Sequence, residues 1–177
     1  MGRSGTLFAY QSEDIEPDII ALAKGLGGGF PVGVVMAKAE VGDAMVPGTH
    51  GSTFGGNPLA MRSANAVLEL LLENDFLSNL RKMIVYFDKK MDELIKNDMQ
   101  NNPIIFAKKG SGMLRGFQLN EVVTAGDFSN IAREKSLLLV GAAENTIRLL
   151  PPLNTSKEEV DNAFDILNDI VLELKKT

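Results

Sequence analysis

Cysteine is absent from this chain of 177 residues, and histidine occurs once. Without cysteine the chain has no disulfides and no thiolate chemistry, and with one histidine a zinc site is not expected. No apolar run reaches the length of a membrane span, and nothing after Met1 has the pattern of a signal-peptide core. The net charge of −5 and the pI near 5.0 argue against binding to nucleic acid or to a membrane surface. We therefore expect a cytoplasmic protein whose partners are small molecules.

Length and composition are those of a globular protein with a real core. Hydrophobic residues make up 45% of the chain and charged residues 23%. At this length we expect one domain, or one domain with part of another. The first residues also fit the permissive N-myristoylation pattern, with Gly2 and Thr6 in the required places.

The first 73 residues are predicted to combine short buried strands, a glycine loop and one helix. Residues 17–23 and 32–37 are apolar runs on either side of the glycines, although periodicity alone would also allow a short helix at the first run. Asn57 and Pro58 are a good cap and first position for a helix. That helix is apolar on most of its faces, so we expect it to be buried between larger bodies.

Residues 74–100 are predicted to form a connecting amphipathic helix, and residues 101–177 a small α/β domain. Apolar residues recur along the connecting helix at spacings of three and four. Within the small domain we expect strands at residues 104–110, 113–119, 136–140 and 146–150, and a helix at residues 127–134. A capping box of Ser156 and Glu159 predicts the start of the last helix.

Lys24 stands at the end of an apolar run and directly before four glycines in the segment IIALAKGLGGGFPVG. We expect this lysine to be half-buried, and burial lowers the pKa of an ammonium group until the free amine can condense with an aldehyde. The same residue could instead be an ordinary lysine that extends to solvent from the end of a strand. A dinucleotide loop fits poorly, because Phe30 stands where the third glycine of that motif belongs.

Ser52 and Thr53 lie in the segment GTHGSTFGGNPLA, just before the helix that Asn57 begins. Hydroxyl groups and backbone N–H groups ahead of a helix are typical of a phosphate site, and the alternative is an ordinary loop that leads into a helix. A lysine that reacts with aldehydes and a separate phosphate anchor together suggest pyridoxal phosphate. His50, in the same loop, is interpreted as a structural residue rather than a catalyst.

Arg148 interrupts the apolar segment ENTIRLLPPLN. An arginine in such a strand is costly to bury unless an anion meets it, and its planar guanidinium suits a carboxylate. Two interpretations remain open, a substrate carboxylate and a buried structural salt bridge.

The segments around Lys24, Thr53 and Arg148, together with MGRSG at the start, resemble the class III pyridoxal-phosphate aminotransferases over essentially the whole chain. Within that family the chain is most similar to the enzymes that act on acetylornithine. The resemblance implies part of the large domain of a fold type I PLP-dependent transferase, followed by a small C-terminal α/β domain. It also implies the second half of a longer enzyme, because the family's cofactor-binding aspartate, stacking aromatic ring and upstream substrate arginine are not in this chain.

The resemblance also assigns roles to single residues. Lys24 would be the catalytic lysine that carries pyridoxal phosphate, and Thr53 would contact the phosphate of the cofactor in the partner subunit of a homodimer whose active site lies at the interface. Ser52 would lie beside the substrate, and Arg148 would bind a carboxylate of the amino-acid or oxo-acid substrate. The implied reaction moves the δ-amino group of N-acetylornithine to 2-oxoglutarate, giving N-acetylglutamate semialdehyde and glutamate, in arginine biosynthesis.

Two alternatives to this reaction stay open at this point. The ornithine, succinylornithine and 4-aminobutyrate enzymes of the same class share the residues that match Lys24, Thr53 and Arg148. A different possibility is a non-catalytic α/β module, since the cofactor-binding aspartate is absent from the chain.

Overall fold

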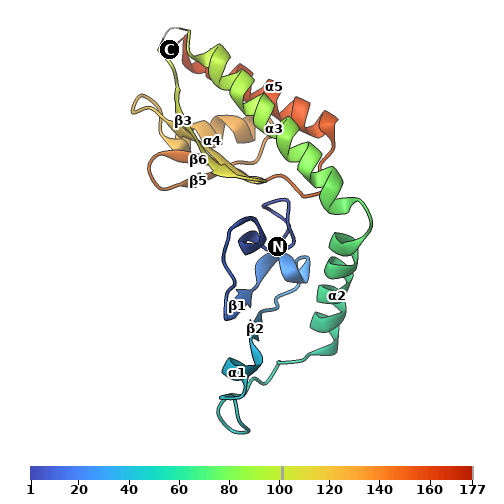
Figure 1. Cartoon of the computed structure of the whole chain (residues 1–177). Helices are drawn as coiled ribbons and strands as arrows, with labels where there is room; N and C mark the ends of the chain where they lie inside the picture. Colours follow the sequence, from blue (N-terminus) through green and yellow to red (C-terminus); the bar gives the residue numbers. More distant parts are fainter. Residues whose placement is uncertain (101, 177) are drawn as a thin grey trace. The chain divides into compact units, whose positions relative to one another are not determined.

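The computed structural model describes residues 1–100 and 102–176 (Figure 1). Contacts between residues divide them into two compact units. The N-terminal unit contains Met1–Gly2 and Thr6–Leu77, and the C-terminal unit contains Arg3–Gly5 and Ser78 onwards. The chain thus contributes three residues near its start to the C-terminal unit before it returns to the N-terminal one.

The N-terminal unit is built from one antiparallel strand pair and short helices. Strand β1 (Ile19–Leu22) pairs with β2 (Val34–Ala37), and Ile20 lies opposite Met36. The 3₁₀ helices η1 (Ala9–Ser12) and η2 (Lys24–Gly27) and the short α1 (Ala39–Gly42) flank these strands. The strand assignment of residues 17–23 is confirmed, and the short-helix alternative is excluded.

Helix α2 (Pro58–Leu72) begins where the sequence predicts. The Asn57 side-chain oxygen accepts hydrogen bonds from the backbone N–H groups of Leu59 (3.0 Å) and Ala60 (3.3 Å). Proline at the first helical position costs no hydrogen bond there, because that N–H has no partner within a helix. The helix packs against η2, and its small residues Ala60 and Ala64 are buried.

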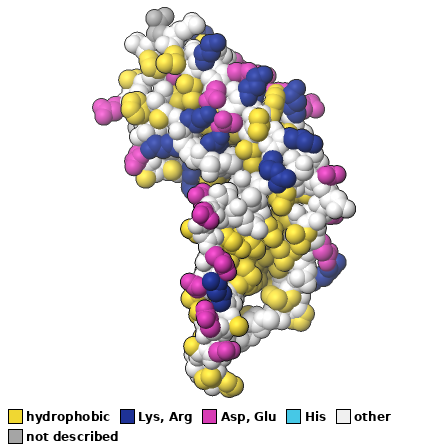
Figure 2. All heavy atoms as spheres, in the orientation of Figure 1, with side chains coloured by type: hydrophobic (Ala, Val, Ile, Leu, Met, Phe, Trp, Pro, Cys, Tyr) yellow, Lys and Arg dark blue, Asp and Glu magenta, His cyan; other side chains and the backbone are white. Residues whose placement is uncertain are grey.

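The expected burial of these elements is wrong for the described residues. On β1 and β2 no residue is fully buried, and Val35 is 71% exposed. Large apolar side chains of α2 are exposed as well, namely Leu59, Leu70 and Leu72. Hydrophobic side chains gather accordingly on the face of this unit that Figure 2 shows. The apolar segments thus form β1, β2 and α2 as expected, but the N-terminal unit contains few residues that shield their side chains from solvent.

The C-terminal unit has a four-stranded antiparallel sheet with the order β3-β4-β6-β5. Its strands are β3 (Ile105–Ser111), β4 (Leu114–Leu119), β5 (Val140–Ala142) and β6 (Thr146–Leu149). Helix α4 (Ala125–Glu134) packs against β5, β6 and α5 (Lys157–Leu174). The Ser156–Glu159 capping box is present as predicted, with the Ser156 N–H donating to Glu159 at 2.7 Å.

Helix α3 (Phe76–Asp98) belongs to this C-terminal unit from Ser78 on. The Phe87 ring meets the Phe164 ring of α5 edge to face at 5.2 Å between centroids, and the two helices run side by side in Figure 1. Buried aromatic pairs of this kind add about 0.5–1.5 kcal/mol beyond the effect of area alone. The helix that the sequence suggests as a connector is therefore part of the core of the unit.

One predicted strand is largely wrong. Residues 136–140 read as a strand, but β5 starts only at Val140, which pairs with Arg148 of β6. The partner strand ends at Leu149 and is followed closely by Pro151 and Pro152, which have no N–H to offer a ladder. Without a continuing partner, Leu137 and Leu139 line an apolar cavity of about 370 Å³ instead.

Candidate active site

Lys24 is the first residue of η2 and follows β1 after one intervening alanine. Its backbone φ is +51°, which lies in the left-handed region. A residue with a side chain is uncommon there and costs on the order of 1 kcal/mol. Such strain tends to persist where function requires it, and here it occurs at the lysine that the sequence singles out.

The side chain of Lys24 is exposed, so the expectation that this lysine is half-buried is wrong. It lines an open hollow of about 590 Å³ together with glycines of the loop, Phe30, Pro31 and Val32. The sequence argument failed because an apolar run predicts burial only where other elements cover the strand. The amine of Lys24 has open space around it, and it is ion-paired to no carboxylate of the described residues.

Lys38 is the nearest other lysine and has a different environment. Its Nζ lies 2.9 Å from Asp18 and 3.5 Å from Glu16. The hydrogen bond to Asp18 raises the pKa of Lys38, which keeps its ammonium protonated. A protonated amine does not attack an aldehyde. Lys38 is thus bound to two carboxylates, whereas Lys24 has no such partner among the described residues.

The glycines after Lys24 allow close packing in this loop. A Cβ at Gly28, whose φ is +58°, would lie 2.9 Å from Cγ2 of Val67, and a Cβ at Gly27 would lie 2.8 Å from Cγ1 of Val32. The hydroxyl of Ser63 on α2 donates to the Gly27 carbonyl at 2.8 Å. The loop that carries Lys24 is thus held against α2 by the Ser63 hydrogen bond and by the close approach of Gly28 to Val67.

Ser52 and Thr53 lie in an exposed turn before α2. Within the described part of the chain neither hydroxyl has a hydrogen-bond partner, so both are available to a ligand. The helix N-terminus itself is less available than the sequence suggests, because Asn57 already accepts from two of its N–H groups. A phosphate here would be bound by the Thr53 hydroxyl and loop N–H groups rather than by the helix. His50, in the same loop, is exposed.

Arg148 lies on β6, where it pairs with Gly116 of β4 and Val140 of β5. Its side chain is exposed, and no carboxylate of the described residues forms an ion pair with it. The expected burial of Arg148 and the alternative of a structural salt bridge are therefore both wrong. The cause is the strand alternation: Ile147 and Leu149 point into the core, and Arg148 points to the opposite face.

The face of the sheet that carries Arg148 is hollowed. Residues from all four strands line a hollow of about 350 Å³ that includes Arg148, Gly116 and Thr146. The other charges there are compensated, since Lys109 pairs with Glu144. A Cβ at Gly116 would come within 2.8 Å of the Ile147 carbonyl oxygen, so the position beside Arg148 stays free of a side chain. This arrangement presents one uncompensated guanidinium to an anionic ligand.

The structure assigns Lys24, Ser52 and Thr53 to the N-terminal unit and Arg148 to the C-terminal unit. Sequence reasoning missed one residue, Arg3, whose position in MGRSG gave no match to a substrate-binding role. In the structure its guanidinium donates to the backbone carbonyls of Met113 and Pro151. No sequence signal marks this role, because both partners are more than 100 residues away.

Comparison with known proteins decides the family. The sequence model of the class III aminotransferases matches residues 1–171. The chain belongs to the class III aminotransferases. It is 41% identical over 163 residues to acetylornithine aminotransferase 1 of Bradyrhizobium diazoefficiens, which covers 92% of the chain and 39% of that protein. It is 40% identical to the acetylornithine aminotransferase of Oceanobacillus iheyensis, over 98% of the chain and 42% of that protein.

Solved class III aminotransferase structures have the same α/β fold. Acetylornithine aminotransferase from Elizabethkingia anophelis superposes with a TM-score of 0.86 at 34% identity, over 97% of the chain and 43% of that structure. Plasmodium falciparum ornithine δ-aminotransferase superposes with a TM-score of 0.90 at 29% identity, over 99% of the chain and 44% of that structure. The chain thus spans about two fifths of the length of these relatives. The expected fold class is confirmed.

Class III aminotransferases depend on pyridoxal phosphate, and the residues present fit that cofactor. Its aldehyde requires an amine, and Lys24 offers one in open space. Its phosphate requires donors, and the Thr53 hydroxyl is uncommitted among the described residues. Those residues contain no group of side chains arranged to hold a metal ion. None of the described helices is long and apolar enough to cross a membrane.

Proposed function

We propose that this chain is the part of a pyridoxal-phosphate transaminase that carries the cofactor-bearing lysine and a substrate-binding arginine. The preferred substrates are N-acetylornithine and 2-oxoglutarate, and the products are N-acetylglutamate semialdehyde and glutamate, in cytoplasmic arginine biosynthesis. The observation that carries this proposal is the family match over residues 1–171, and the positive φ of Lys24, which has no ion pair among the described residues, supports the choice of lysine. Identity near 40% to several acetylornithine aminotransferases supports the substrate.

Lys24 and Arg148 are proposed to have different roles in the reaction. When bound, pyridoxal phosphate supplies an aldehyde that takes up the amino group and a ring that draws electrons from the substrate carbon. Lys24 Nζ would hold the cofactor by its aldehyde, and as a free amine it would accept and return a proton at the substrate carbon. The open hollow beside Gly28 and Gly29 gives this amine the room that the transfer needs.

Arg148 orients the oxo acid through its carboxylate. Its planar guanidinium can donate two parallel hydrogen bonds, which fixes the direction of the ligand as well as its position. The hollow around Arg148 leaves space for a small dicarboxylate, because Gly116 has no side chain. Ser52 is proposed to lie beside the substrate.

The protein is further proposed to act as a homodimer with the active site at the interface. Thr53 of one subunit would then contact the phosphate of the cofactor held by the other subunit. The exposed apolar side chains of α2 support an assembly, because Leu59 and Leu72 are 64% and 63% exposed in the described chain. Surfaces of this kind mark places where another body packs.

Ornithine is the second candidate amino donor, since the ornithine aminotransferase of Plasmodium falciparum shares the fold with a TM-score of 0.90. Measuring kcat/KM for N-acetylornithine and for ornithine, with 2-oxoglutarate as the acceptor, separates the two; the measurement uses the cofactor-loaded full-length transaminase of which this chain is proposed to be a part. We expect N-acetylornithine to be preferred at least about tenfold, which corresponds to about 1.4 kcal/mol in the transition state. A preference for ornithine would replace the proposed substrate, and the absence of transfer from either donor would reject the proposed activity.

A further inference from the structure

The segment Arg3–Gly5 is bound at both ends to the C-terminal unit. At one end the Met113 N–H donates to the Arg3 carbonyl at 2.7 Å, and the Arg3 side chain donates back to the Met113 carbonyl at 3.2 Å. A Cβ at Gly112 would lie 2.0 Å from the Arg3 carbonyl oxygen, so the β3–β4 turn must have glycine there. This close approach fixes the position of the Arg3 backbone and therefore of its Cα atom.

At the other end the segment rests on α3. The Arg81 guanidinium donates to the Gly5 carbonyl at 3.0 Å. Gly5 has a φ of +86°, and a Cβ there would lie 3.0 Å from Cγ of Arg81 and 3.1 Å from Cδ1 of Ile84. Because both ends are held, the guanidinium of Arg3 is not a freely moving surface group.

Arg3 acts where the ladder between β4 and β6 ends. The ladder pairs Gly116 with Arg148 and Arg115 with Leu149, and continuing it by two positions brings Met113 opposite Pro151. Proline has no N–H, so the ladder cannot continue at Pro151. One nitrogen of Arg3, Nη1, donates to the carbonyls of both Met113 and Pro151 and so supplies the missing connection.

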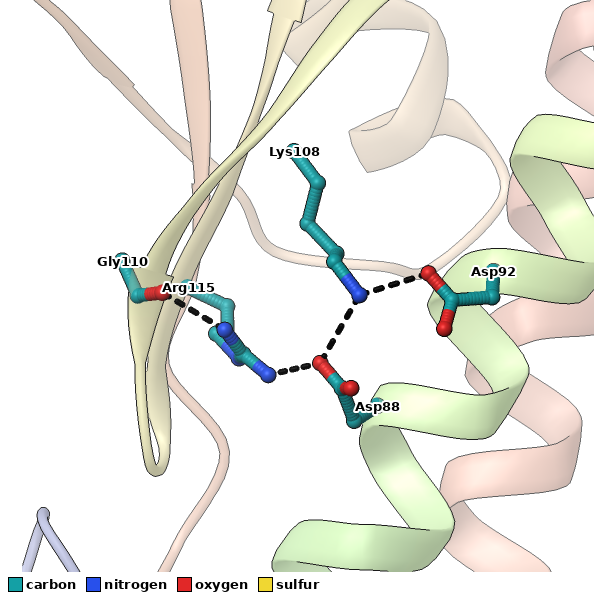
Figure 3. A network of polar contacts seen from close by, with 5 residues as sticks. All are labelled: Asp88, Asp92, Lys108, Gly110 and Arg115. Carbon is teal, nitrogen blue, oxygen red and sulfur yellow. Dashed lines mark hydrogen bonds and ion pairs between the residues drawn. The ribbon is translucent and has the colours of Figure 1, made fainter.

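The β3–β4 hairpin, which contributes Met113 to this connection, is held to helix α3 by ion pairs. Arg115 of β4 forms an ion pair with Asp88 of α3, and Lys108 of β3 lies 3.1 Å from Asp88 and 2.5 Å from Asp92 (Figure 3). Arg115 also donates to the Gly110 carbonyl at 2.5 Å. Attachment of Pro151 to Met113 therefore ties the end of β6 to a rigid hairpin.

We propose that Arg3 is a positioning residue for Arg148. Arg148 lies three residues before Pro151 on a strand of four residues, so the connection made by Arg3 limits how far this strand can shift. A bidentate contact between guanidinium and carboxylate tolerates little misplacement. Arg3 is assigned a positioning role and not substrate contact, because its Nη1 donates to two backbone carbonyls. This inference rests on the proposed role of Arg148 in binding the oxo acid.

The test compares Arg3→Ala, Arg3→Lys and, as a matched control, Arg133→Ala in the cofactor-loaded full-length transaminase of which this chain is proposed to be a part. Arg133 is an exposed arginine of the same unit whose side chain, among the described residues, bonds only to Asn130 of its own helix. We expect Arg3→Ala to raise KM for the oxo acid about five- to twentyfold while kcat and KM for the amino donor change less than about twofold. Arg3→Lys should restore most of the affinity, because one ammonium nitrogen can donate to both carbonyls.

Amide hydrogen exchange of the same variants provides a measurement that does not depend on activity. Exchange in peptides that cover Thr146–Leu149 should be faster in Arg3→Ala than in the wild type and in Arg133→Ala. Unchanged exchange in Arg3→Ala would overturn the inference, and so would faster exchange with an unchanged KM for the oxo acid. Equal losses with both substrates would mean a purely structural role. If the wild type transfers no amino group, the proposed function fails, and the exchange data still decide whether Arg3 holds β6.

Discussion

At the scale of single residues, Arg148 and Thr53 are proposed to bind different partners. Arg148 presents a guanidinium with no intrachain carboxylate among the described residues, and Thr53 presents an uncommitted hydroxyl in an exposed turn. Arg148→Ala should therefore lower the transition-state binding of the oxo acid by about 2–4 kcal/mol, with the cofactor retained. Thr53→Ala should instead weaken cofactor retention. Steady-state kinetics and cofactor content after dialysis measure the two effects, and equal cofactor loss in both variants would refute the division of roles.

The residue scale also shows what the sequence could not predict. Neighbouring residues in the sequence single out Lys24, but they do not predict its positive φ at the junction of β1 and η2. The exposure of Arg148 follows from which face of β6 packs on the helices, and an apolar strand with one arginine does not reveal that. The anchoring role of Arg3 depends on partners far along the chain.

At the scale of elements, helices α3 and α5 are joined by a polar contact that depends on pH. The Tyr86 hydroxyl donates to Asp161, and Lys90 lies 3.0 Å from the same carboxylate. The hydrogen bond from Tyr86 lowers the pKa of Asp161, and the bond to Asp161 raises the pKa of Tyr86 to about 12. A lowered carboxyl pKa contributes stability that is lost as pH falls through it, and a raised phenol pKa contributes stability that is lost as pH rises through it. The contact is thus fully effective between about pH 4 and pH 10.

Tyr86→Phe removes this hydroxyl and keeps the ring over which Lys157 lies at 5.0 Å. We expect the variant to have a lower Tm than the wild type at pH 7 and a difference that shrinks as the pH is lowered below about 4. Tyr10→Phe is the matched control, because the Tyr10 hydroxyl bonds to none of the described residues. A Tm difference independent of pH would contradict this assignment.

Elements defined by local hydrogen bonds could be predicted well. Asn57 and the Ser156–Glu159 pair start their helices as the sequence indicates, because each cap bonds to residues two or three positions away. The segment 136–140 could not be predicted in the same way. A strand needs a partner, and whether β6 offers one depends on the prolines that follow it.

At the scale of the whole molecule, the two units differ in how much apolar surface they bury. The C-terminal unit has a continuous core that includes Phe117, Phe128, Ile147 and Leu167, all at most 1% exposed. The N-terminal unit leaves side chains such as Phe54 at 81% exposure. Limited proteolysis of the isolated 177-residue chain should therefore degrade the N-terminal unit first and leave a resistant fragment that begins near Ser78. Cleavage within the C-terminal unit at equal speed would contradict this difference.

The proposed function predicts that the isolated chain binds pyridoxal phosphate weakly and has no measurable transaminase activity. Its N-terminal unit exposes both the loop of Lys24 and the apolar side chains around it. Weak binding would show as little absorbance at about 400–430 nm after gel filtration, where the lysine-bound cofactor absorbs. A yellow, active chain of 177 residues would contradict the prediction.

The central claim is that Lys24 carries the cofactor. The most direct measurement is to reduce the cofactor-loaded full-length transaminase, of which this chain is proposed to be a part, with borohydride and to map the labelled peptide. We predict a single adduct on Lys24 and its loss in Lys24→Ala. Lys38 provides the matched comparison, because it forms ion pairs with Asp18 and Glu16, and Lys38→Ala should retain the adduct. An adduct on Lys38, or one that persists in Lys24→Ala, would contradict the account.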